Sequence, residues 1–380
     1  MARVSPEIES FTRIKVLGIG NSGTNSVNHM VRSRIKGVEF ITVDTDAQKL
    51  HLSLASKKIH IGKNLTRGLG GGMNPEIGKK AAEETKEAIQ ETLKGADMVF
   101  IACGFGGGTA SGAAPVVAKI AKEQGILTIA IVTRPFTFEG AFRARIAEEA
   151  LMNLRDAVDA MIIIPNDRLF GLINKETSFL SAFQMCDDVL KQAVEGISDL
   201  ITMPGIINLD FADVKAVMQN AGSALMGIGS AQGENRAEEA AKMAINSPLL
   251  DLSIDGAKGV LFAISGGENM TMLEVQSAAN IITESIDSDA KVIFGAINDD
   301  RLKKDEIKVT VIASGFPEGK NIRKPSLFQN IPSRPVENEN SAEKEKGKAA
   351  EGEPRQGREK LLEEDEESQK AIPAFLRRKK

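Results

Sequence analysis

A glycine-rich segment between an apolar strand-like run and an apolar helical run constrains this chain more than any other feature. Residues 104–112 read Gly-Phe-Gly-Gly-Gly-Thr-Ala-Ser-Gly; they follow the strand-like run 97–103 and precede the helical run 113–121, which has Pro115 in its expected first turn. Glycine lets the main chain approach an oxygen atom closely, and the N–H groups at a helix N-terminus favour anions. A glycine turn that serves packing alone is the weaker alternative at a strand-to-helix junction, so we predict a phosphate-binding loop.

Length and composition set broad limits on the class of protein. The chain has 380 residues, enough for two domains and additional segments, and 42% of them are hydrophobic. The net charge of -4 and the absence of Trp and Tyr argue against a nucleic-acid partner. Cys103 and Cys186 do not make a disulfide framework, and three scattered His residues do not make a zinc site. Without a secretory signal or an apolar run of membrane-spanning length, we expect a soluble, cytoplasmic protein that does not insert into a membrane.

Alternating strand and helix patterns in the first half of the chain predict an α/β fold. We expect a Rossmann-like parallel sheet that is covered by helices on both faces. Helical patterns at 74–93 and 143–157 lie between strand candidates. The strand candidates are 13–19, 38–44, 58–61, 97–103, 126–133 and 160–164.

A long helix and a different pattern follow. The stretch 177–203 has Gly196 as its one glycine and contains no proline, and its apolar residues recur at helical spacing, so we predict one long helix between two domains. From Pro204 onward the pattern is that of a second, α+β domain whose strands would form a second sheet. Its expected strands are 257–265, 291–297 and 306–313, and its expected helices are 210–220, 234–246 and 270–285.

The composition changes again near the C-terminus. Residues 318–370 are rich in Glu, Lys, Pro, Asn and Gln, and they cannot bury enough apolar surface to offset their ordering entropy, so we expect a disordered tail. We interpret the last ten residues as a docking peptide, with a frayed terminus of no function as the alternative. These residues are apolar and then basic, and the apolar anchors are Ile372, Pro373, Phe375 and Leu376.

A second glycine motif supports a rival hypothesis. Gly18-Ile-Gly-Asn-Ser-Gly23 follows a predicted strand and opens a helix, and Asp44 ends the next strand. This layout matches the dinucleotide-binding fingerprint of an NAD-dependent oxidoreductase. The segment 104–112 would be surplus in such a site, and the rest of the chain offers no obvious hydride-transfer constellation. The P-loop pattern G-x-x-x-x-G-K-[ST] does not occur, so backbone amides and a metal ion would hold the phosphates.

Several ordered blocks of sequence match one family. The sequence resembles the tubulin/FtsZ family of GTPases over about residues 12–317 and in its last ten residues. The matching blocks are Gly106-Gly-Gly-Thr-Ala-Ser-Gly112, Thr133-Arg-Pro-Phe-Thr-Phe-Glu-Gly140, Ile164-Pro-Asn-Asp-Arg-Leu169, Asn208-Leu-Asp-Phe-Ala-Asp-Val-Lys215, Asn220-Ala-Gly-Ser-Ala-Leu-Met-Gly-Ile-Gly229 and Ile372-Pro-Ala-Phe-Leu376.

The resemblance implies an assembling GTPase. Such a protein would bind GTP and GDP with Mg²⁺, with K⁺ as a further candidate, polymerise head to tail into protofilaments and form the cytokinetic Z ring at midcell. The C-terminal peptide would bind membrane tethers and division regulators. A scaffold that binds GTP without turnover is a further alternative. The implied parts are a GTP-binding domain at 12–176, a central helix at 177–203, a C-terminal activation domain at 204–317, the disordered linker at 318–370 and the peptide at 371–380.

The resemblance also assigns the nucleotide contacts. A carboxylate at Asp187 suits guanine, because guanine has N1–H and N2–H donors that adenine lacks, and such donors are costly to leave unpaired. Without the resemblance, Asp187 would be interpreted as an exposed carboxylate on a helix. The phosphate contacts would come from Gly20, Asn21, Ser22 and Asn25, from Gly70, Gly71, Gly72 and Asn74, and from Gly107, Gly108, Thr109 and Ala110. Glu139 and Arg143 would contact the ribose and phosphate side, Asn166 and Asp187 would read guanine, and Phe183 would stack on it.

The resemblance assigns catalysis to Asn208, Asp210 and Asp213. Under it, this segment projects into the nucleotide pocket of the next subunit, and its side chains orient the attacking water. From spacing alone, the two carboxylates are equally well explained as capping residues at the start of a helix.

Several residues depart from the family pattern, among them Asn21 and Ser22, which stand where the family often has glycines. Ala110 stands where a glycine is usual, so we expect a restricted φ and altered loop flexibility. Asp44 stands where Asn is common, and its negative charge would repel phosphate unless a cation or a partner offsets it.

Overall fold

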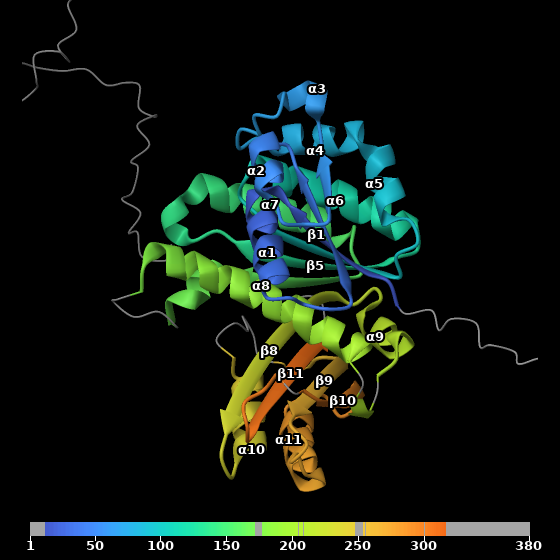
Figure 1. The fold of residues 1–380 in the computed structure, drawn as a ribbon, viewed down its shortest axis with the longest axis vertical. Helices are drawn as coiled ribbons and strands as arrows, with labels where there is room; N and C mark the ends of the chain where they lie inside the picture. The colour runs from blue at the N-terminus through green and yellow to red at the C-terminus, as the bar shows by residue number, and fades with distance from the viewer. Residues whose placement is uncertain are drawn as a thin grey trace, which may run out of the picture. The chain divides into compact units, whose positions relative to one another are not determined.

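The computed structural model describes residues 12–171, 177–203, 205–207, 209–247, 254, 256–299 and 301–316. Helix α8 (Phe179–Thr202) runs between an N-terminal α/β part and a C-terminal part (Figure 1). It lies inside the stretch for which one long helix is expected, and that prediction is confirmed. The expected linker and docking peptide lie outside the described residues.

The described strands form one sheet. They are β1 (Ile14–Ile19), β2 (Val38–Asp44), β3 (Lys57–His60), β4 (Met98–Gly104), β5 (Leu127–Arg134), β6 (Ala160–Pro165), β7 (Gly205–Ile207), β8 (Gly222–Gln232), β9 (Gly259–Gly266), β10 (Lys291–Asn298) and β11 (Glu306–Ser314). The order across the sheet is β3-β2-β1-β4-β5-β6-β8-β11-β9-β10-β7. Neighbours from β3 to β6 are parallel, whereas β11 is antiparallel to β8 and β9. The parallel α/β arrangement of the first half is therefore confirmed.

The expectation of a separate second sheet is wrong. The first residues of β8 pair with β6, from Ala160 opposite Gly222 to Ile162 opposite Ala224, and the rest of β8 pairs with β11. This bridge joins the two halves of the sheet. β8 is missing from the expected strands because its glycines weaken the strand signal.

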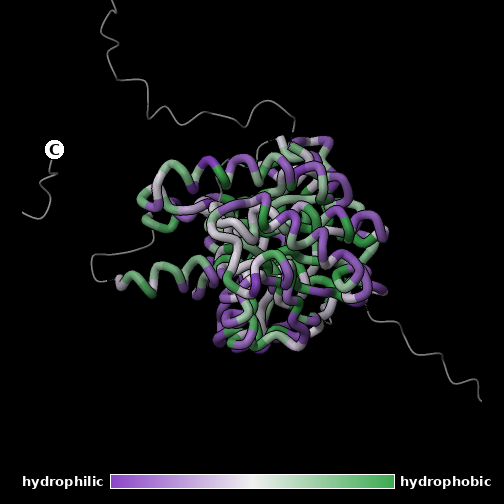
Figure 2. The backbone as a smooth tube through the Cα atoms, turned by 90° about the horizontal axis from the view of Figure 1, so that it is seen from above, coloured by the Kyte–Doolittle hydropathy of each residue, from purple (hydrophilic) through white to green (hydrophobic). Residues whose placement is uncertain are grey.

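Helices cover both faces of the parallel strands. Besides α8 they are α1 (Gly20–Arg32), α2 (Ala47–Leu52), α3 (Lys63–Thr66), α4 (Pro75–Glu84), α5 (Lys86–Leu93), α6 (Gly108–Glu123), α7 (Ala141–Arg155), α9 (Phe211–Met218), α10 (Arg236–Ile245) and α11 (Met272–Glu284), with 3₁₀ turns η1 (Thr137–Glu139) and η2 (Asn166–Gly171). The outer helices carry hydrophilic and hydrophobic residues in alternation (Figure 2). Among the helices described, none has the length and apolar character of a membrane span.

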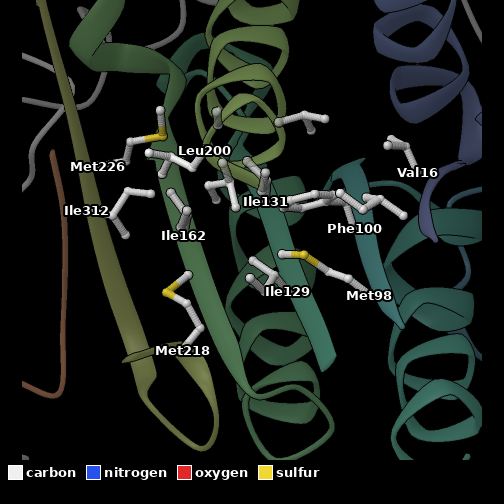
Figure 3. Close-up of a cluster of buried hydrophobic side chains, with 14 of the residues drawn as sticks. Val16, Met98, Phe100, Ile129, Ile131, Ile162, Leu200, Met218, Met226 and Ile312 are labelled. Atoms are coloured by element: carbon white, nitrogen blue, oxygen red, sulfur yellow. The ribbon is translucent and has the colours of Figure 1, made fainter. Parts of the chain in front are cut away.

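The parallel strands are buried on both faces, which explains their continuous apolar sequences. Val16 and Phe100 belong to a cluster with residues of α1, α8 and α9, whereas Leu17 and Ile101 belong to a cluster with residues of α4 to α7. Figure 3 shows the first cluster, in which side chains from neighbouring strands gather beside Leu200 of α8. A third cluster lies among β8, β9, β11, α10 and α11.

Two expected helix boundaries are wrong. α6 begins at Gly108, so the last glycine-segment residues form its first turns and Pro115 lies inside the helix. The expected helix at 74–93 is two helices, α4 and α5, which meet at Thr85. The Thr85 hydroxyl donates to Ala81 O and accepts a hydrogen bond from Gly62 N, and this local bonding competes with a continuous helix.

Glycine allows α4 and α6 to pack backbone to backbone. A Cβ added at Gly112 would lie 1.9 Å from Pro75 O, and one added at Gly78 would lie 2.3 Å from Gly108 O. Neither position has room for a side chain. The start of α4 is thereby held against the first turns of α6.

We expect Gly112→Ala to lower the free energy of unfolding by about 3 kcal/mol, because overpacking at the crossing outweighs the roughly 1 kcal/mol that Ala brings to a helix interior. Denaturant unfolding measures the change. In the control Gly267→Ala, the nearest described atom to the new Cβ is 3.4 Å away, and we expect a change of about 0.5 kcal/mol or less. A Gly112→Ala protein as stable as the parent would contradict the tight crossing.

Candidate functional site

Two helices begin side by side at one end of the sheet. β1 and β4 are parallel neighbours, with Gly18 opposite Ala102. α1 begins directly after β1, and α6 begins shortly after β4. In the part of the chain that the structure describes, no side chain caps the first turn of either helix. The N–H groups of both first turns therefore face one site and are available to an anion.

Glycine brings the starts of the two helices into contact. A Cβ added at Gly20 would lie 3.2 Å from Ala110 Cβ, and one added at Gly104 would lie 2.7 Å from Ser22 Oγ. Two motifs that are far apart in sequence thus form one surface. Ala110 lies in the first turn of α6, where no positive φ is needed, so the expectation that alanine restricts a flexible loop is wrong.

A third segment packs against the same surface. A Cβ added at Gly71 would lie 3.0 Å from Thr109 N, and one added at Gly108 would lie 2.7 Å from Asn74 N. The Asn74 side chain accepts a hydrogen bond from Glu76 N at 3.0 Å and so caps α4. Side chains on these glycines would fill the space between the loops, which indicates a cradle for a ligand that the main chain contacts closely.

The remaining phosphate-contact candidates border this cradle. Asn21 and Asn25 are exposed and lie one turn apart on α1. Added Cβ atoms at Gly70, Gly72 and Gly107 would meet no described atom within 4 Å, so the main chain is open at these positions.

Glu139 and Arg143 connect α7 to the glycine segment. Glu139 Oε1 accepts a hydrogen bond from Phe136 N at 3.0 Å, and Glu139 Oε2 lies 3.3 Å from Arg143 Nη1. A Cβ added at Gly106 would lie 3.2 Å from Arg143 O. Both candidates therefore lie beside the cradle.

The candidates for base recognition come from α8 and from the end of β6. Phe183 and Asp187 lie one turn apart on α8, and Phe183 packs edge-on against Phe136 with ring centroids 5.4 Å apart. Asn166 begins η2, is 6% exposed, and its buried Oδ1 has no partner among the described residues. An unpaired buried oxygen is costly, so this site fits a base that carries N–H donors.

Asp44 is a buried carboxyl close to the cradle. Its Oδ1 accepts hydrogen bonds from Thr45 N at 2.7 Å and Asp46 N at 3.2 Å, and its buried Oδ2 has no partner among the described residues. The Thr45 hydroxyl is 2.6 Å from the Thr109 hydroxyl of the cradle. Burial raises the pKa of Asp44 to about 6, because the charged form is desolvated.

The candidate catalytic carboxylates lie elsewhere in the chain. Asp210 Oδ1 accepts a hydrogen bond from Asp213 N at 2.8 Å, and Asp213 Oδ2 accepts one from Asp210 N at 3.4 Å. This reciprocal cap starts α9, which follows the C-terminal end of α8. Phe183 and Asp187 lie near the N-terminal end of α8. A helix of 24 residues is about 36 Å long. One chain therefore does not bring these carboxylates to its own cradle; Asn208 lies outside the described residues.

Three contacts of the site have no signal in the local sequence. Thr45 contacts Thr109, and Ser26 donates a hydrogen bond to Asp187 at 2.5 Å. His29 lies 2.8 Å from Asp188. The partners are 64, 161 and 159 residues apart, so no local pattern contains both members of a pair.

No group of three or more His, Cys, Asp or Glu in the described residues is arranged to hold a metal ion. Mg²⁺ in nucleotide sites is bound by one or two carboxylates together with phosphate oxygens. Asp44 is a buried carboxylate that borders the cradle through Thr45.

Comparisons with known proteins agree with this geometry. A family model described as the tubulin/FtsZ family GTPase domain matches residues 13–174, and one described as the FtsZ family C-terminal domain matches residues 222–317. The solved structure of an empty FtsZ dimer from M. jannaschii is 45% identical, with a TM-score of 0.77 and coverage of 80% of this chain and 89% of that chain.

Two structures from Haloferax volcanii share the fold at lower identity. CetZ2 in a GTPgS-bound protofilament is 20% identical, with a TM-score of 0.69 and coverage of 81% of this chain and 95% of that chain. CetZ1 as a GDP-bound monomer is 19% identical, with a TM-score of 0.71 and coverage of 81% of this chain and 95% of that chain.

The fold and the family matches thus define the tubulin-like class of GTPases. The chain belongs to the tubulin/FtsZ family, and its residues 222–317 match the C-terminal domain of the FtsZ members of that family. A GTPase domain of this family implies that the chain binds guanine nucleotides. The NAD-dependent oxidoreductase alternative is therefore wrong, because its glycine motif at 18–23 belongs to the GTPase domain.

We expect Asp44→Asn to stabilise the nucleotide-free protein at pH 7.5. The pKa of Asp44 is raised to about 6, so the carboxyl destabilises the fold once it ionises as pH rises through that value. Its charge then costs roughly 2–3 kcal/mol, and the advantage of Asn should vanish below about pH 4. Urea unfolding at both pH values tests this. The control Asp46→Asn, at a partly exposed helix cap, should change stability by about 0.5 kcal/mol or less; equal stability of Asp44→Asn and the parent at pH 7.5 would contradict the expectation.

Proposed function

We propose that this chain hydrolyses GTP in a site that a second copy of the chain completes, and that it polymerises head to tail into protofilaments that form the cytokinetic ring. The observation that carries the proposal is the separation of two half-sites along α8. The phosphate cradle and base candidates lie near one end of this helix, and the carboxylates of α9 follow the other end. Head-to-tail stacking joins opposite ends of neighbouring subunits.

Guanine would be read by Asn166 and Asp187. The Asp187 carboxylate would accept hydrogen bonds from N1–H and N2–H, and the free Oδ1 of Asn166 would accept a further one. Phe183 would stack on the base, held by its edge contact with Phe136. An adenine base would leave the Asp187 carboxylate without these donors, which is the source of the nucleotide preference.

The phosphates would be held by main-chain N–H groups at the starts of α1 and α6, with the Thr109 hydroxyl and the Arg143 guanidinium beside them. Glu139 would contact the ribose and orient Arg143, to which it is paired at 3.3 Å. Mg²⁺, when bound, would neutralise charge that develops on the transferred phosphoryl group.

The water that attacks would be oriented by Asp210 and Asp213 of the neighbouring subunit, together with Asn208. The cap of α9 uses Asp210 Oδ1 and Asp213 Oδ2, so one oxygen of each carboxylate is left for this role. The cap also holds the two side chains in position, which suits a reaction that depends on positioning and electrostatics. Hydrolysis would then require assembly.

The comparisons support self-association in a general way. The FtsZ structure from M. jannaschii is a dimer, and CetZ2 was solved as a protofilament with GTPgS. We propose in addition that the filaments form a division ring and that the hydrolytic site is shared between subunits.

We expect Asp213→Asn to bind GTP normally and to lose hydrolysis by on the order of 100-fold, because the amide cannot accept the water proton. Asn keeps a cap acceptor, so α9 should persist. The control Asp287→Asn changes an exposed carboxylate that accepts from Asp289 N and takes no part in the cap of α9, and it should have parental activity. Parental hydrolysis should rise per subunit with protein concentration and accompany filaments in electron micrographs with GTP.

A mixture of two inactive variants tests the shared site directly. Asp187→Ala removes the base contact and leaves the α9 carboxylates intact, whereas Asp213→Asn does the reverse. Random mixing in equal amounts should form intact sites at about a quarter of the interfaces and restore that share of activity. A mixture that assembles but stays inactive contradicts the shared site. Parental protein that binds GTP but shows no single-turnover hydrolysis at high concentration indicates a scaffold without turnover.

The C-terminal peptide is proposed to dock on membrane tethers and division regulators. Its apolar anchors are Ile372, Phe375 and Leu376, and Arg377 to Lys380 would steer it toward acidic surfaces. Deletion of residues 371–380 should leave GTP hydrolysis and filaments unchanged and prevent midcell recruitment of the tether. Recruitment that survives the deletion would contradict this role, and a control that reverses the order of the ten residues keeps length and composition constant.

A further inference from the structure

Ser26 and Asp187 form a partly buried contact between α1 and α8. Ser26 Oγ lies 2.5 Å from Asp187 Oδ1, and Ser26 is 0% exposed. The same hydroxyl lies 3.1 Å from Ser22 O, one turn earlier on α1. A serine hydroxyl carries one hydrogen, so it can donate fully to only one of these two acceptors.

The distances and the charges select Asp187 as the acceptor. A hydrogen bond to a carboxylate is shorter and stronger than one to a neutral carbonyl. Ser22 O, as a carbonyl inside α1, is also the acceptor for the helical N–H four residues later. The Ser26 hydroxyl is therefore directed at Asp187 Oδ1. None of the hydrogen bonds among described residues uses Asp187 Oδ2, which leaves that oxygen free.

The next carboxylate on α8 is held by the same helix. His29 Nε2 lies 2.8 Å from Asp188 Oδ1, and Lys191 Nζ lies 3.6 Å from that oxygen. Asp187 and Asp188 thus each have their own partner on α1. Because Ser26 and His29 lie one turn apart, the two contacts fix how α8 is rotated toward α1 at the base-recognition end.

We propose that Ser26 is a positioning residue for guanine recognition: its hydroxyl holds Asp187 Oδ1 and thereby keeps the carboxylate aimed at the base. The inference rests on the proposed function, in which Asp187 reads guanine. It adds a residue of α1 that contacts no part of the base and acts through Asp187.

The charged groups around Asp187 give the expected pH dependence. Burial raises the pKa of Asp187, the Ser26 hydrogen bond and His29 of α1 lower it, and Asp188 raises it. Glu139 of η1 acts on the neighbouring Cys186, whose pKa is raised mainly by burial. Removal of the Ser26 hydroxyl should raise the pKa of Asp187 further. As pH decreases, the carboxylate that accepts from guanine would then become protonated at a higher pH than in the parent.

The test is the ratio of GDP affinity to inosine diphosphate affinity, measured by calorimetry over a pH series that descends from neutral toward the ordinary range of a carboxyl pKa. Inosine diphosphate lacks the 2-amino group, so the ratio reports the base contact. Titration of the phosphates and of Asp44 affects both ligands and cancels.

In the parent, the ratio should fall as pH decreases. In Ser26→Ala the fall should occur at higher pH. At a pH where the parental ratio is still high, the ratio of the variant should be roughly three- to ten-fold lower, as expected for a lost hydrogen bond to a charged group. Ser26→Thr keeps the hydroxyl and should restore the parental profile. Thermal unfolding of each variant shows that it is folded, and Ala at this helix position should be tolerated.

Several outcomes separate this inference from the proposed function. If Ser26→Ala lowers the affinity for both ligands equally at every pH, or leaves the parental profile unchanged, the positioning role is wrong. Asp187→Asn should give a low ratio that does not vary with pH. If the parent does not prefer GDP, or if Asp187→Asn keeps the parental preference, the assignment of guanine recognition to Asp187 fails independently of Ser26.

Discussion

The adjacency of β1 and β4 is the constraint on which the rest of the structure depends. These parallel strands each lead into a helix whose first turn no described side chain caps, and the two helices start against one another. The strand order therefore places the N–H groups of both first turns side by side, where they are available to an anion. The backbone contact exists only because Gly20 and Gly104 leave space for Ala110 and Ser22.

The same close packing extends to the elements around the cradle. Gly78 and Gly112 let α4 cross α6 at the main chain, and Gly71 lies against Thr109. Arg143 at the start of α7 reaches Gly106. A ligand in the cradle would therefore contact elements that are already rigidly connected, which is the preorganisation that phosphate binding and phosphoryl transfer require. The length of α8 keeps the carboxylates of α9 away from this cluster.

Sequence predicted elements well where burial imposes a periodic or continuous pattern. The parallel strands are apolar because both faces are buried, and the strand expected at 38–44 has those bounds in the structure. β8 was missed because its glycines resemble a loop, and its pairing with both β6 and β11 turns two expected sheets into one. The start of α6 was predicted too late because a glycine-rich segment is typical of a loop. In the structure, the last residues of this segment form the first turns of α6 and pack against α4.

By itself, the sequence determined the family, the parallel α/β core, the long helix α8 and the glycine loops of the site, because each depends on local spacing or on motifs within one segment. Only the tertiary structure decided which loops meet, that Asp210 and Asp213 cap α9, and that Ser26 donates to Asp187 across 161 residues. It also decided that Asp44 is buried with one free oxygen. These properties depend on which surfaces come into contact, and contact between distant segments is set by packing of the whole chain rather than by the pattern of any one segment.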